Sequence, residues 1–207
     1  LYADESNIGT QIANIIVNDL NFHELLSVVP IPGLPDMDGL IQIDVNYIDQ
    51  GDLFLVDGKF DVNRFTYEGQ HVGDIATQFT YSPESETIHA IDALLNYNGT
   101  SIATMTGTYD VEGAGRLNTD LTLLDVPMSM ISPFIPDQIV TFSGTLAGNL
   151  NVAGPTDSLL FNGALMPHDI HVLSKQYSLD LALANDTIPF TDSRVLFNSF
   201  KFYGADT

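Results

Sequence analysis

The chain has 207 residues and a formal net charge of −21, because it contains 27 Asp and Glu but only 6 Lys and Arg. Nucleic-acid binding depends on Lys and Arg side chains that neutralise phosphates, so this charge argues against a nucleic-acid partner, and equally against docking onto an anionic membrane surface. The absence of cysteine excludes disulfides and thiol chemistry.

The N-terminus shows no basic and apolar signal segment, and no apolar run approaches the ~20 residues that a membrane-spanning helix needs. Because Leu1 is not an initiating Met, we expect a fragment or a processed chain, with any membrane anchor outside it.

The first third of the chain is predicted to hold three strands and one short helix. Apolar residues at i, i+3, i+4 and i+7 predict the helix over residues 21–29, with Asn21 as its cap and Pro30 as its end. The predicted strands are residues 8–17, 41–47 and 53–62.

The middle third is predicted to be four consecutive strands joined by short turns, which makes their pairing antiparallel. Asn98-Gly99 is a strong hairpin signal, because a type I′ turn needs positive φ at both positions. The strands are residues 72–81, 87–97, 100–111 and 116–124.

Residues 140–166 carry the clearest strand pattern, in which Leu146, Gly148, Leu150 and Val152 alternate with small or polar residues. We predict a turn at Ser143-Gly144, a break at residues 153–155 and a second run over residues 159–161 that ends at Asn162-Gly163. Two further strands are predicted at 178–183 and 195–203, the last of them aromatic on both faces.

The same order of elements occurs twice along the chain. Gly39 and Gly58 flank one strand pair, and Gly144 and Gly163 flank another that lies 105 residues later. The sequence therefore predicts a single elongated β domain over residues 1–207, built from two repeats of about 105 residues, approximately 18–122 and 123–207. Chance similarity between strands bounded by glycine is the alternative.

Together these patterns predict an all-β chain of about twelve strands with two short helical turns. Each strand has one apolar face, which must be covered by a second sheet, by closure of the sheet or by a ligand. A closed β-sandwich is therefore the alternative to an open, curled antiparallel sheet.

The segments PMSMISPFIPD, SGTLAGNLNVAG and LLFNGALM, within residues 127–166, resemble the C-terminal repeats of the TamB/AsmA-like family of envelope proteins. Residues 22–60 match the same pattern more loosely, with Ile43 at the position of Gly148. The resemblance implies an elongated, U-shaped sheet whose apolar concave face stays open as a groove. It also implies a periplasmic location in a two-membraned bacterium, within a longer membrane-anchored protein.

The function that this resemblance implies is non-enzymatic. The groove would shelter phospholipid acyl chains in transit between membranes, or strands of an outer-membrane β-barrel protein during assembly, with the assembly machinery as a further partner. A plain closed core is the other interpretation of the same residues. The candidate lining residues are Ile41, Ile43, Val45, Leu117, Leu121, Leu123, Leu146, Leu150, Val152, Leu179, Leu181 and Leu183.

The sequence predicts no catalytic residues, no cofactor and no metal site. Residues 168–171 hold the only histidine cluster, and on a regular strand His168 and His171 point to opposite faces. A structural, adhesive or carbohydrate-binding β-sandwich is the alternative function; eight tyrosines could stack on sugars, although the chain has no tryptophan.

Overall fold

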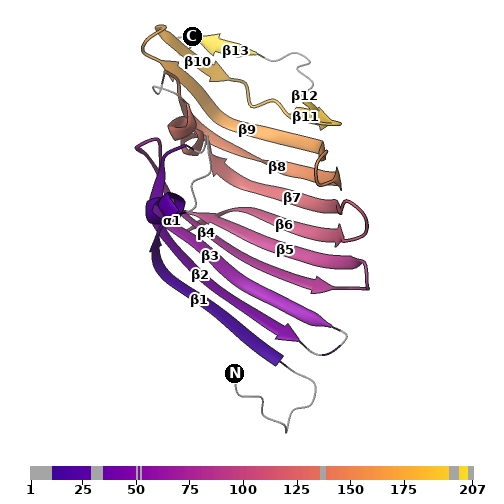
Figure 1. The fold of residues 1–207 in the computed structure, drawn as a ribbon. Helices are drawn as coiled ribbons and strands as arrows, with labels where there is room; N and C mark the ends of the chain where they lie inside the picture. The colour runs from indigo at the N-terminus through magenta and orange to yellow at the C-terminus, as the bar shows by residue number, and fades with distance from the viewer. Residues whose placement is uncertain are drawn as a thin grey trace.

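The computed structural model describes residues 11–28, 35–49, 51, 53–135, 139–195 and 201–204. They form one antiparallel sheet of 13 strands with two short helices (Figure 1). The strands are β1 (Gln11–Asn21), β2 (Met37–Asp49), β3 (Phe54–Tyr67), β4 (Gln70–Pro83), β5 (Ile88–Tyr97), β6 (Thr100–Asp110), β7 (Arg116–Pro127), β8 (Thr141–Pro155), β9 (Leu160–Ser174), β10 (Leu179–Leu183), β11 (Ile188–Thr191), β12 (Arg194–Val195) and β13 (Phe202–Gly204).

The strands follow one another across the sheet in chain order from β1 to β10, and β13 pairs with β10. β11 pairs with a different part of β9 from the one that β10 occupies, and β12 pairs with β11. The sheet is not closed, and no second sheet packs on it in the described part of the chain. The predicted all-β, curled open sheet is therefore confirmed, and the alternative of a closed β-sandwich is wrong.

Both helices lie at the same end of the strands. In α1 (Phe22–Val28), the Asn21 side chain accepts a hydrogen bond of 3.0 Å from the backbone N–H of Glu24, so Asn21 caps the helix as predicted. The predicted end at Pro30 lies outside the described residues. The second helix, η1 (Met128–Phe134), is a 3-10 helix that packs against β8 and β4.

Aromatic side chains connect this helical end to the sheet. The rings of Phe22 in α1 and Phe65 in β3 meet edge to face, with 6.3 Å between their centroids. The rings of Tyr67 and Phe134 of η1 are 4.8 Å apart. These contacts place both helices at one end of the sheet, and among the described residues no helix covers the opposite end.

Several strand boundaries differ from the predictions. β9 continues through Asn162 and Gly163 instead of ending there, because Gly163 (φ 145°) adopts a conformation that keeps it in the ladder with Leu150. Gly144 (φ 88°) lies within β8, beside the bulge that Asp169 forms in β9, and not in a turn. The predicted hairpin at Asn98-Gly99 is confirmed, with φ of 48° and 78°. Most of the predicted strand 195–203 lies outside the described residues.

Bulges recur at matching positions in the two halves of the chain. Asp19 in β1 and Asp125 in β7 both have left-handed backbone conformations beside a shift of register. Arg64 in β3 and Asp169 in β9 also have left-handed backbone conformations beside a shift of register, and they lie 105 residues apart. The division of the domain into two repeats stays a prediction that this correspondence favours.

Close approach of neighbouring strands requires glycine within the sheet. A Cβ atom on Gly148 would lie 2.3 Å from the carbonyl oxygen of Ala164 on β9, and φ at Gly148 is 144°. A Cβ atom on Gly163 would lie 2.2 Å from the carbonyl oxygen of Asn149. Both contacts are with backbone, which cannot move aside as a side chain can.

We predict that Gly148→Ala lowers the free energy of unfolding by about 2 kcal/mol or more, through backbone strain and steric overlap. Gly204→Ala is the matched control, because Gly204 has open space around its Cβ position and no positive φ. Urea denaturation followed by far-UV circular dichroism measures both. Equal effects of the two substitutions would contradict the close approach of β8 and β9.

Candidate apolar binding face

One side of the sheet is apolar across its whole width. Residues that are directly opposite each other in an antiparallel ladder point to the same side, so the register assigns each strand residue to a face. One unbroken row runs Ile15, Val45, Gly58, Phe79, Ala93, Met105, Leu121, Leu150 and Gly163. We call this side the apolar face.

The other side, the polar face, carries hydrogen-bonding side chains at the neighbouring positions of the same strands. The Nδ2 of Asn46 donates to the Asp57 carboxylate at 3.2 Å, and that of Asn151 donates to the Asp120 carboxylate at 3.1 Å. The polar row runs Asn14, Asn46, Asp57, Thr80, Asp92, Thr106, Asp120, Asn151 and Asn162.

The register places all twelve predicted lining residues on the apolar face. Ile41, Leu150 and Val152 are buried, with 2%, 8% and 7% of their surface exposed. The other nine are half-buried. The predicted set therefore divides into a small buried group and a larger group that solvent, or a bound molecule, can reach.

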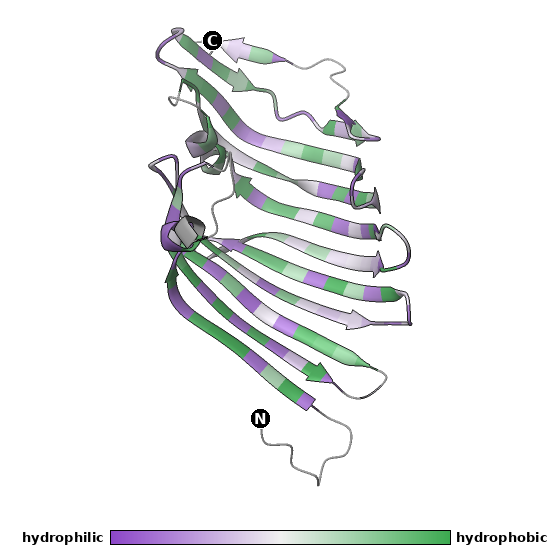
Figure 2. Cartoon of the chain, viewed as in Figure 1, coloured by the Kyte–Doolittle hydropathy of each residue, from purple (hydrophilic) through white to green (hydrophobic). Residues whose placement is uncertain are grey.

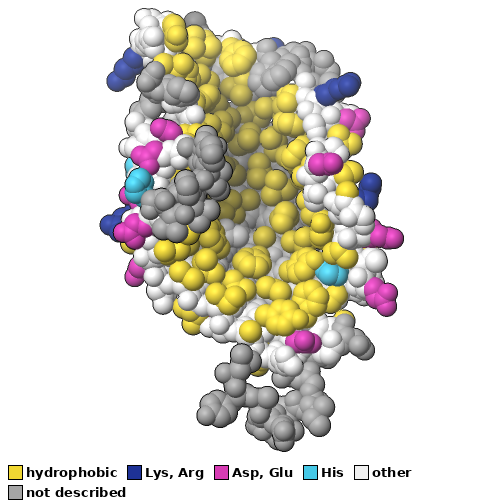
Figure 3. Space-filling view, viewed as in Figure 1, with side chains coloured by type: hydrophobic (Ala, Val, Ile, Leu, Met, Phe, Trp, Pro, Cys, Tyr) yellow, Lys and Arg dark blue, Asp and Glu magenta, His cyan; other side chains and the backbone are white. Residues whose placement is uncertain are grey.

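Space-filling and hydropathy views agree with this assignment. Hydrophobic and hydrophilic residues alternate along the strands in Figure 2, as a sheet with two unlike faces requires. Figure 3 shows a hollow whose floor is formed almost entirely by hydrophobic side chains, with acidic, basic and histidine side chains around its outline. A large apolar surface that no described element covers commonly marks a site that binds a ligand or another protein.

Sequence reasoning missed several members of the apolar face. Phe79, Leu95 and Met105 lie on it, in strands to which the sequence analysis assigned no lining residue. Their alternation with polar neighbours would have identified them. The ring of Phe79 lies over Gly58, where a Cβ would come within 2.8 Å of it, a contact that only the register between β3 and β4 reveals.

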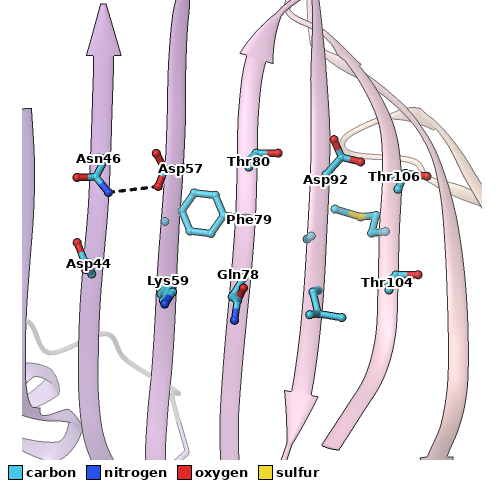
Figure 4. A pocket seen from close by; sticks show the side chains of 14 residues that line it. Asp44, Asn46, Asp57, Lys59, Gln78, Phe79, Thr80, Asp92, Thr104 and Thr106 are labelled. Atoms are coloured by element: carbon cyan, nitrogen blue, oxygen red, sulfur yellow. Dashed lines mark hydrogen bonds between the residues drawn. The ribbon is translucent and has the colours of Figure 1, made fainter. Parts of the chain in front are cut away.

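A separate depression of about 410 Å³ spans β2 to β6 (Figure 4). Its lining is mostly two rows of side chains that the register assigns to the polar face, with four apolar-face residues between them. It therefore does not coincide with the predicted site. The lining residues are Asp44, Asn46, Asp57, Gly58, Lys59, Gln78, Phe79, Thr80, Asp92, Ala93, Leu94, Thr104, Met105 and Thr106.

The prediction that His168 and His171 face opposite sides is wrong. The bulge at Asp169 adds a residue to β9, so His168 pairs with Thr145 and His171 with Ser143, which share the polar face of β8. Among the described residues, no group of three or more His, Asp or Glu side chains is arranged to hold a metal ion.

No family model, curated protein or solved structure matches this chain. The resemblance to TamB/AsmA-like repeats therefore stays a prediction. Neither helix within the described ranges has the length and hydropathy that crossing a bilayer requires.

The division between buried and half-buried residues leads to a stability prediction. Leu150→Ala removes buried surface and leaves a cavity, so we expect it to lower the free energy of unfolding by about 3 kcal/mol. Leu179→Ala, at a half-buried position on the same face, should cost about 1 kcal/mol. Chemical denaturation of both variants tests this; a larger loss for Leu179→Ala would contradict the assigned burial.

Proposed function

We propose that this chain carries or shelters acyl chains of phospholipids on its apolar face, as a periplasmic module of a TamB/AsmA-like envelope protein in a two-membraned bacterium. The observation that carries the proposal is the uncovered apolar face: one continuous row of apolar side chains and glycines across nine strands, with no second layer over it in the described part of the chain. The sequence resemblance supplies the family and the location.

The physical reason for binding is transfer from one apolar environment to another. Keeping an acyl chain out of water avoids a transfer free energy of about 0.8 kcal/mol for each CH₂ group. Half-buried side chains such as Val45, Leu95 and Leu121 leave surface for that contact. Because the apolar row continues from strand to strand, a chain moving along it exchanges similar contacts, and the headgroup stays in solvent.

Two adjacent leucines of β5 offer a matched test. Leu95 pairs with Thr77 and Ala103 on the apolar face, and Leu94 pairs with Gln78 and Thr104 on the polar face; both are half-buried. We expect Leu95→Arg to weaken binding of a fluorescent fatty acid at least tenfold, because the charge would be placed in the apolar contact. Leu94→Arg should leave binding within about twofold of the unchanged chain.

Native mass spectrometry of the purified chain, with lipid analysis of the same sample, accompanies this titration. Co-purified phospholipid that is lost in Leu95→Arg supports acyl-chain binding. A lipid-free mass and no uptake of the probe by the unchanged chain would contradict the proposal. Loss of binding in Leu94→Arg alone would assign the ligand to the depression of Figure 4 instead. Far-UV circular dichroism confirms that each variant folds.

A second candidate function is supported by the free edge of the sheet. β1 pairs with β2 on one side only in the described part of the chain, and its isoleucines are exposed on both faces: Ile12 at 71%, Ile15 at 60% and Ile16 at 59%. An exposed apolar edge is a template for strand addition. The client would be a strand of an outer-membrane β-barrel protein during assembly.

Proline substitutions separate the two functions. Ala13 and Asn14 are consecutive in β1, so the backbone N–H of one of them points away from β2. We therefore test both Ala13→Pro and Asn14→Pro. If strand addition is the function, the substitution that removes the N–H pointing away from β2 should abolish binding of a β-strand peptide, whereas Leu95→Arg should not. Our proposal predicts the opposite ranking for acyl-chain uptake, and fluorescence titration with each ligand measures it.

A further inference from the structure

Five aromatic rings gather on the apolar face at the end of the strands opposite to α1 and η1. We call them the aromatic cluster: Tyr47, Phe54, Tyr81, His89 and Tyr109, from β2 to β6. The ring of Phe54 contacts those of Tyr47 at 5.7 Å, Tyr81 at 6.0 Å and His89 at 5.7 Å between centroids. His89 also pairs with Tyr109 in the β5–β6 ladder, which places all five rings together.

The cluster is hydrogen-bonded and presents an aromatic surface to solvent. Tyr81 and His89 are joined by a hydrogen bond between the phenol oxygen and Nδ1. Burial, and then the neighbouring Tyr109, raise the pKa of the Tyr81 phenol above its ordinary value, so this phenol stays neutral. Tyr47 is 39% exposed and stacks on Phe54.

The charges around the aromatic cluster are acidic. Asp49 lies directly opposite Phe54 on the same face, and its carboxylate accepts a hydrogen bond of 2.9 Å from the N–H of Gly51. The adjoining turns carry Glu84, Glu86 and Glu112, all exposed. An anionic ligand group would be repelled here, and a cationic group would be attracted.

The cations of strands β2 to β7 lie elsewhere. Lys59 pairs with Asp44 and Gln78 on the polar face, and Arg116 pairs with Asp110 on the same side. Arg64 is in the bulge of β3, near the helical end. Since aromatic ring faces attract ammonium groups and a carboxylate reinforces that attraction, this end of the apolar face has the chemistry of an ammonium site.

We propose that the aromatic cluster and Asp49 bind the ammonium group of a zwitterionic lipid, choline or ethanolamine in type, whose acyl chain lies along the apolar face. This inference rests on the proposed function and adds the headgroup class to it. The phosphate of the headgroup stays in solvent, since the described Lys and Arg side chains of β2 to β7 all lie away from this end of the apolar face.

The test compares lysophospholipids that share one acyl chain and differ in the headgroup: phosphocholine, phosphoethanolamine and phosphoglycerol. Each displaces a fluorescent fatty acid from the full chain at constant ionic strength. We expect the two ammonium-bearing lipids to displace it at about fivefold lower concentration than the phosphoglycerol lipid. A choline lipid that competes better than the ethanolamine lipid would assign the site to a quaternary ammonium, and the reverse to a primary one.

Matched variants separate local recognition from general repulsion by the net negative charge. Asp49→Asn and Tyr47→Leu should bring the three headgroups to within about twofold of each other. Asp92→Asn removes the same charge from the polar face, and Tyr177→Leu removes an exposed tyrosine at the other end of the sheet; both should keep the fivefold preference.

Each remaining outcome overturns the inference. Equal displacement by all three lipids contradicts the ammonium site and leaves acyl-chain binding standing. If Asp92→Asn reduces the headgroup preference as much as Asp49→Asn does, the preference comes from the net charge of the chain and not from the aromatic cluster. Failure of every lipid to displace the probe, or no uptake of the probe, contradicts both the ammonium site and the proposed function.

Discussion

The pairing of residues across an antiparallel ladder is the constraint on which the molecule depends. Residues that are opposite each other in neighbouring strands lie on the same face of the sheet. The alternation of apolar and polar residues in each strand therefore gives the whole sheet one apolar and one polar face. Val45, Phe79 and Leu121 therefore belong to one surface although they are far apart in the chain. A shift of one residue in any ladder would place leucines on the polar face. The bulges at Asp19, Arg64, Asp125 and Asp169 add a residue to one strand only.

In the described part of the chain, no second sheet covers the apolar face. The two helices cover one end, where Ile41, Val62 and Ile102 are buried. Towards the aromatic cluster, the side chains are half-buried and remain available for contact. The polar face carries carboxylates and amides that hydrogen-bond with one another and with water, which accounts for much of the strongly acidic composition. One sheet thus presents an apolar surface on one side and a polar surface on the other.

Local patterns in the sequence predicted what depends on neighbours along the chain. The alternation in β8, the hairpin at Asn98-Gly99 and the cap at Asn21 each depend on a few consecutive residues, and the structure confirms them. What the sequence left open depends on pairing between strands: the choice of one sheet over a sandwich, and the contact of Phe79 with Gly58. A bulge reverses the alternation that a pattern assumes, which is why His168 and His171 were placed on different faces.

Photo-cross-linking tests most directly whether the apolar face is the surface that holds a ligand. A phospholipid with a diazirine at the end of one acyl chain is irradiated with the purified chain, and mass spectrometry locates the modified residues. We expect modification at apolar-face positions such as Phe79, Leu95 and Leu121. Excess unlabelled phospholipid, added before irradiation, should prevent this labelling. Modification mainly at polar-face positions such as Leu94 and Thr104, or labelling that unlabelled lipid does not reduce, would contradict it.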